Sequence, residues 1–164
     1  MTLNTLKDVY IDQLQDIYSA DRQALDVTRE LADKAVNDDL REALERGVKG
    51  ISEGMEKIAN LIKAHGADPT DEFCEAMEGL VKEARHHAVK SDISDPHVRD
   101  AVIITQYQRL VHYAIAGYGS LAAFARRLGL GEEAEMLQGC LDKTYHGDSE
   151  MSRIAVGEVN REAL

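Results

Sequence analysis

The chain has 164 residues, 44% of them hydrophobic and 30% charged, with no tryptophan and only two prolines. The formal net charge of −11 argues against binding to nucleic-acid phosphates. No apolar run is long enough to span a membrane, and the N-terminus lacks the pattern of a signal peptide. We therefore expect a cytoplasmic protein that binds neither nucleic acid nor membrane.

The first two predicted helices carry apolar residues at alternating steps of three and four, the spacing of a bundle-forming helix. The first apolar seam comprises Leu3, Leu6, Tyr10, Leu14, Ile17, Asp21, Leu25, Thr28, Leu31 and Ala35. Asp39 and Glu42 then resemble a capping box that opens the second helix. Its seam comprises Leu40, Leu44, Gly47, Ile51, Gly54, Ile58, Leu61 and His65. Gly66 suits the end of this helix, and Pro69 prevents its continuation.

One short helix and two long helices follow. Phe73, Met77, Leu80 and Ala84 have the spacing of a short amphipathic helix. Asp95 as N-cap, with Pro96 in the first turn, opens the third long helix. The third seam comprises Ile103, Tyr107, Leu110, Ala114, Gly117, Leu121, Ala125 and Leu128. The fourth comprises Leu130, Ala134, Leu137, Leu141, Thr144, Asp148, Met151 and Ala155.

The connections between the four long helices are short, long and short in turn. That order is typical of a four-helix bundle with one long crossover, as in ferritin-like folds. The sequence therefore predicts an all-α, ferritin-like four-helix bundle whose long crossover contains a short helix. No strand pattern or linker divides the chain, so we expect one domain over residues 1–164.

Two carboxylates interrupt otherwise apolar seams. Asp21 lies on the first seam and Asp148 on the fourth, and Thr144 precedes Asp148 by one turn. A buried carboxylate must be protonated, hydrogen-bonded, paired with a base or bound to a metal. Each Asp could thus be satisfied by Arg, Tyr or water, or the two could be ligands of a carboxylate-bound metal pair. The Glu-x-x-His motif of such sites does not occur on the four predicted long helices; its one match, Glu83 with His86, lies in the crossover.

The remaining reactive residues show no catalytic pattern. His112 and His146 each fall two residues from a seam position, so we expect both to point away from the core. Cys74 and Cys140 have no motif spacing and are expected to be reduced. Nucleophile and phosphate-binding motifs are absent, so no catalytic residue is assigned.

Glycines are unusually placed on the predicted helices. Gly47, Gly50 and Gly54 share one face of the second helix, where each costs about 1 kcal/mol relative to alanine. They could allow close helix packing, or they could mark larger side chains lost from a former site, with space left behind. Gly117 on the third seam would let a neighbouring helix or a Tyr ring approach closely.

Three stretches, LKDVYIDQLQDIYSADRQAL (6–25), CEAMEGLVKEA (74–84) and HYAIAGYGSLAAFARRLGL (112–130), resemble the YciE/YciF family of ferritin-like bacterial stress proteins. The resemblance extends from about residue 5 to residue 156 in one register. It implies a ferritin-like bundle, frequently dimeric and linked to stress responses, with no settled biochemical activity. Through rubrerythrin-type relatives, it also implies a carboxylate-bound pair of iron or manganese ions.

The chain departs from the family at the implied ligand positions. The family usually has Glu where Asp21 stands, His and Glu at Gly47 and Gly50, two Glu at Val111 and Ala114, and Glu at Thr144. Only Asp21 and Asp148 remain as residual metal-ligand candidates, and two carboxylates cannot hold two divalent ions.

We therefore expect a non-catalytic, stress-associated homodimer with a degenerate metal site and no cofactor. The alternative is a di-metal oxidoreductase or peroxide-handling protein of the rubrerythrin type, using Asp21, Asp148 and an off-seam Glu53 or Glu150. A third hypothesis is a small-ligand pocket in the space left by Gly47, Gly50, Ala114 and Thr144, unless the helices close up over it.

Overall fold

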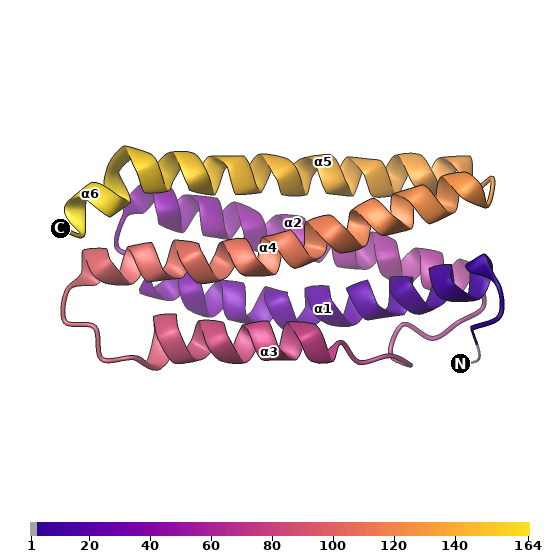
Figure 1. Cartoon of the computed structure of the whole chain (residues 1–164), viewed down its shortest axis with the longest axis horizontal. Helices are drawn as coiled ribbons and strands as arrows, with labels where there is room; N and C mark the ends of the chain where they lie inside the picture. The colour runs from indigo at the N-terminus through magenta and orange to yellow at the C-terminus, as the bar shows by residue number, and fades with distance from the viewer. Residues whose placement is uncertain (1–2) are drawn as a thin grey trace.

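The structure is a computed structural model that describes residues 3–164. Four long helices surround a common axis, and a short helix lies outside them (Figure 1). Their bounds are α1 Leu6–Lys34, α2 Asp38–Ala64, α3 Glu75–Ala84, α4 Pro96–Arg127, α5 Gly131–Ile154 and α6 Asn160–Glu162, with π-helical segments η1 Arg85–Lys90 and η2 Ala155–Val159. This is the predicted ferritin-like four-helix bundle, with α3 in the long crossover between α2 and α4.

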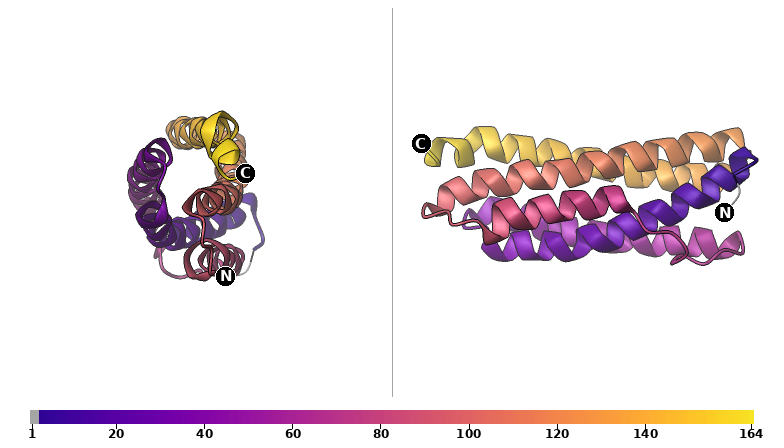
Figure 2. Two further views of the ribbon diagram at one scale, coloured as in Figure 1. Left: turned by 90° about the vertical axis from the view of Figure 1, so that its left-hand side faces the viewer. Right: turned by 60° about the horizontal axis from the view of Figure 1, so that its bottom comes forward.

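The bundle consists of two helical hairpins, α1–α2 and α4–α5. In cross-section, α1 lies beside α2 and α4, and α5 lies beside the same two helices (Figure 2). Helix α3 packs on the outside against α1 and α4. The space at the centre is therefore bordered by one face of each long helix. None of the helices in residues 3–164 is both long and apolar enough to cross a lipid bilayer.

Local capping explains where the first two helices begin. Thr5 and Asp8 form a reciprocal capping box at the start of α1, so Leu3 lies outside the helix and is half exposed. The predicted capping box for α2 is wrong: Asn37 is the N-cap, and its side chain accepts a hydrogen bond from the Leu40 amide. The Asn37 side chain, two residues before Asp39, thus supplies the hydrogen-bond acceptor that the free backbone amides of the first turn require.

The crossover begins as predicted, since Gly66 has a φ of +75°, and this left-handed conformation ends α2. Cys74 caps α3 with its sulfur, which accepts from the Met77 amide. Phe73 therefore precedes the helix and is about half exposed, contrary to its predicted place on the amphipathic face. The buried residues of α3 are Met77, Val81 and Ala84.

Helix α4 begins as predicted, with Asp95 as N-cap and Pro96 in the first turn. Its Gly117 permits the close approach expected of it: an added Cβ would overlap the Ile17 side chain of α1. Buried side chains form two clusters along the bundle, one toward each end. Residues of both clusters border the same central space, which holds the candidate site.

Candidate functional site

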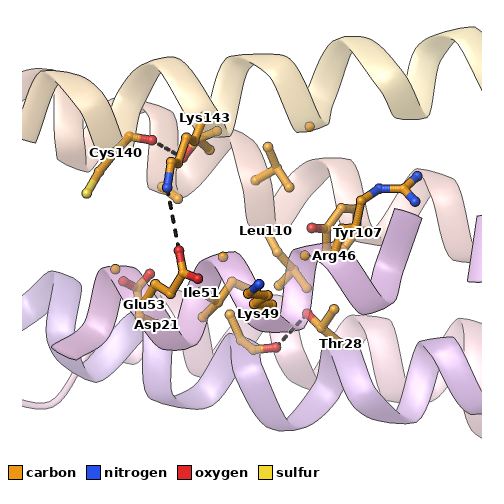
Figure 3. A pocket seen from close by; sticks show the side chains of 18 of the residues that line it. Asp21, Thr28, Arg46, Lys49, Ile51, Glu53, Tyr107, Leu110, Cys140 and Lys143 are labelled. Carbon is orange, nitrogen blue, oxygen red and sulfur yellow. Dashed lines mark hydrogen bonds and ion pairs between the residues drawn. The ribbon is translucent and has the colours of Figure 1, made fainter. Parts of the chain in front are cut away.

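A cavity of about 550 Å³ occupies the middle of the bundle. All four long helices border it, and Met77 of α3 reaches it from outside the bundle. The exposed residues of its lining all belong to α2 or α5, whereas those from α1 are buried. The cavity therefore opens to solvent between α2 and α5 (Figure 3). Its lining includes Gly47, Gly50, Ala114 and Thr144, the four positions at which the sequence predicts space.

Asp21 is the carboxyl group buried deepest in this lining, and it is only 4% exposed. The Tyr118 hydroxyl donates a hydrogen bond of 2.6 Å to Asp21 Oδ2. No hydrogen bond to Asp21 Oδ1 is formed within residues 3–164. Burial raises the pKa of Asp21 to about 7, and the Tyr118 hydrogen bond only partly opposes this shift. Burial and the nearby carboxylate raise the pKa of Tyr118 well above its ordinary value, so Tyr118 remains the donor.

Two of the three α2 glycines are explained by tyrosines that α4 directs at them. A Cβ on Gly54 would lie 2.8 Å from the Tyr118 hydroxyl, and a Cβ on Gly47 would overlap the Tyr107 hydroxyl. Close packing, the first of the two interpretations of these glycines, therefore applies to both. Gly50 is different, because an added Cβ there would meet no atom within 4 Å. Gly50 leaves the space open.

Two ion pairs bridge the entrance from α2 to α5. Arg46 contacts Glu150 at 2.7 Å, and Lys143 lies 3.5 Å from Glu53 (Figure 3 shows the second pair). The two acidic residues named as additional metal-ligand candidates are thus each paired with a cation at the rim. Both pairs thus connect the two helices between which the cavity opens.

The side chain of Asp148 does not lie with that of Asp21 in the lining of the cavity. Its side chain is 20% exposed and faces α4, where it contacts His112 Nε2 at 3.1 Å and accepts a hydrogen bond from Gln108 at 3.2 Å. Thr144 borders the cavity, but its hydroxyl is committed to the Cys140 carbonyl at 2.8 Å. Of the two residual ligand candidates, only Asp21 reaches the central space.

The histidines lie away from the cavity interior. His112 and His146 are exposed, as predicted, although His146 borders the rim of the cavity. His65 is at the far end of the bundle, where its Nε2 lies 3.0 Å from Glu133, which also accepts from the Tyr10 hydroxyl. Both cysteines are free and buried.

The donors around the cavity are too few for a metal pair. Within residues 3–164 no group of three or more His, Cys, Asp or Glu side chains is placed to hold a metal ion. A transition-metal site normally uses three or more protein ligands, and a pair of ions shares more. One buried carboxyl with tyrosine hydroxyls does not fit iron or manganese bound in that way.

The sequence places Tyr107 on the third apolar seam and does not single out Gly147. Both border the cavity, Tyr107 from α4 and Gly147 from α5. Gly147 lies one turn after Thr144 and one turn before Met151, which is the signal that could have placed it on the cavity face. The Tyr107 hydroxyl carries no comparable signal, because its contacts depend on how α2 and α4 pack.

Fold and cavity together define a ferritin-like helical bundle whose centre is open and poor in carboxylates. The family model described as a domain of unknown function, DUF892, matches residues 5–164, and the chain belongs to this family. Protein YciF of Escherichia coli strain K12 is 31% identical over 164 residues, covering 99% of this chain and 98% of its own.

Two solved structures confirm the architecture. The crystal structure of the E. coli stress protein YciF superposes with a TM-score of 0.89 at 31% identity, covering 97% of this chain and 99% of that one. YcfI from Rhodopseudomonas palustris gives a TM-score of 0.84 at 30% identity, covering 92% and 94%. The resemblance to YciF-type proteins is therefore confirmed along nearly the whole chain.

Proposed function

We propose that this protein is a stress-associated member of its family that works without a carboxylate-bound metal pair and without catalysis at its centre. The stress association is supported by YciF, which is described as a stress protein. The observation that carries the proposal is the composition of the central space. Asp21 is the one carboxyl group at its base, and Tyr118 already occupies one of its oxygens.

Metal content tests the proposal directly. The protein is produced in medium with added iron or manganese, desalted and measured by elemental analysis against protein concentration. We expect far less than one metal ion per chain, because Asp21 is the one carboxyl group at the base of the cavity and the two glutamates at its rim are ion-paired. Two ions per chain would instead support the di-metal oxidoreductase alternative.

A variant with restored donors provides the matched control. In the triple variant Gly50→Glu, Ala114→Glu and Thr144→Glu, carboxylates stand at positions where the family resemblance calls for them. Gly50 has open space for a side chain, and Ala114 and Thr144 border the cavity. We expect this variant to retain metal under the conditions in which the natural chain does not.

The proposal extends to a cytoplasmic homodimer. Two free, buried cysteines suit a reducing compartment, and the net charge of −11 disfavours a nucleic-acid partner. Light scattering coupled to size-exclusion chromatography measures the molar mass in solution. A mass twice that of the 18.2 kDa chain is expected, and a monomer at micromolar concentration would contradict the dimer.

A further inference from the structure

The Tyr107 hydroxyl is a polar group of the cavity that has no protein partner within the described residues. Tyr107 is 5% exposed, and none of the side-chain hydrogen bonds within residues 3–164 involves its hydroxyl. This oxygen is not among buried atoms that lack a partner, so it is open to the cavity rather than enclosed by protein. It borders the cavity beside Gly47, where a Cβ would overlap it. Burial, with a smaller contribution from Glu150, raises the pKa of Tyr107 to about 12, so it keeps its proton. A hydroxyl that faces an open cavity and has no protein partner is available to hydrogen-bond a ligand in place of water.

The way into the cavity is a gap between two ion pairs. Along α2, Gly50 lies between Arg46 and Glu53, and along α5, Gly147 lies between Lys143 and Glu150. Added Cβ atoms at either glycine would meet no atom within 4 Å. Neither glycine is required for helix packing, so their effect is to leave an opening.

The charge around this opening is the reverse of that of the whole chain. The lining includes Arg46, Lys49, Lys57 and Lys143, against two glutamates at the rim. Lys49 and Lys57 take part in none of the ion pairs of residues 3–164. A cationic rim on a chain of net charge −11 favours the approach of an anionic group.

The cavity is long and mainly apolar. Its lining follows α2 from Ala43 to Lys57, a distance of about 20 Å at 1.5 Å per residue. Side chains such as Ile51, Leu110 and Val111 form its walls. The volume of about 550 Å³ is within the range of small-molecule sites.

We propose that this cavity binds an elongated apolar carboxylic acid that carries a hydroxyl group. The carboxylate lies at the rim near Lys57, about 15 Å along α2 from Gly47, the apolar body fills the space between α2 and α4, and the hydroxyl bonds to Tyr107. The ligand enters between α2 and α5, past Gly50 and Gly147. This ligand site is a separate proposal from the absence of a metal pair, and its experiments do not depend on the metal content of the protein.

The hydroxyl contact is tested with a pair of probes and a pair of proteins. Binding of 12-hydroxydodecanoate and of dodecanoate is measured by isothermal titration calorimetry with the natural chain and with Tyr107→Phe. We expect the natural chain to bind the hydroxylated probe about fivefold more tightly, the worth of one hydrogen bond of about 1 kcal/mol. Tyr107→Phe should bind both probes equally, and it should fold normally because the lost hydroxyl had no protein partner.

The entrance and the rim are tested with two further variants. Gly50→Leu should abolish binding of both probes, whereas Gly79→Leu should not affect it. Gly79 is the matched control, because it lies in α3, has equally open space and is outside the cavity lining. The double variant Lys49→Gln, Lys57→Gln should lower the affinity for both carboxylate probes. It should leave the binding of dodecane-1,12-diol, which carries no charge, unchanged.

Three results would overturn the proposal. The first is no heat and no thermal stabilisation when the natural chain is titrated with 12-hydroxydodecanoate. The second is binding that persists in Gly50→Leu, which would place the probe elsewhere on the protein. The third is a preference for the hydroxylated probe that survives in Tyr107→Phe, which would assign the polar contact to another group.

Discussion

Replacement of Asp21 by Asn should change how the stability of the protein depends on pH. In the folded protein the pKa of Asp21 is about 7, whereas its ordinary value is 3.8. The folded state therefore holds this proton more tightly than the unfolded state does. By linkage, the contribution of Asp21 to the free energy of unfolding falls as pH rises from about 4 to about 7, and then stays constant.

The magnitude follows from the difference between the two pKa values. A difference of about three pH units corresponds to about 4 kcal/mol, the upper limit for the cost of ionising this buried carboxyl. Between about pH 5.5 and about pH 8, the natural chain should lose about 2 kcal/mol of stability through Asp21. Asp21→Asn is neutral throughout, and its amide oxygen can still accept from Tyr118. We expect it to lack this loss and to be the more stable protein at about pH 8.

Urea denaturation followed by far-ultraviolet circular dichroism measures this difference at several pH values. Tyr118→Phe serves as a second variant, because the hydrogen bond from Tyr118 lowers the pKa of Asp21. Its removal should move the fall in stability to higher pH. The reasoning would be refuted if Asp21→Asn differed from the natural chain by the same amount at about pH 5.5 and about pH 8. It would also fail if Asp21→Asn were less stable at both.

Two further predictions concern packing and capping. Gly117→Ala should lower stability by about 1 kcal/mol in thermal unfolding. The new Cβ overlaps Ile17, and the free-energy cost of this overlap exceeds the gain in helix propensity. Gly79→Ala should raise stability instead, and Ile17→Val should relieve the effect of Gly117→Ala; equal effects of both alanines would contradict this account. Asp100→Ala should cost about 2–5 kcal/mol by urea denaturation, because this buried carboxylate accepts from two backbone amides in the α1–α2 turn. An unchanged midpoint would show that water replaces the carboxylate.

The local features of this protein were predictable from the sequence alone. The apolar seams, the Asp95–Pro96 start of α4 and the Gly66 end of α2 depend on interactions within a few residues. The short–long–short order of connections then determined the bundle topology. Asp21 was also identifiable, because a carboxyl in an apolar seam is conspicuous wherever its helix packs.

The departures were local as well. The acceptor for the first turn of α2 comes from Asn37 rather than Asp39. Cys74 is the N-cap of α3, so Phe73 precedes that helix instead of lying on its buried face. Several side chains near a helix start can serve as N-cap, and sequence alone does not rank them closely.

The central site depended on how the helices face one another. Asp148 and Gly147 are adjacent on α5 and so point about 100° apart, and Gly147 borders the cavity while Asp148 faces α4. Periodicity identifies the inward half of a helix but not which of its two neighbours a side chain meets. The Arg46–Glu150 pair joins residues 104 positions apart, and the Tyr107 hydroxyl of α4 lies where a Cβ on Gly47 of α2 would stand. The sequence determined the helices and their apolar faces, because these depend on neighbours along the chain. Only the tertiary structure decided that their small residues leave an open cavity, because that depends on the distance between helices that are remote in sequence.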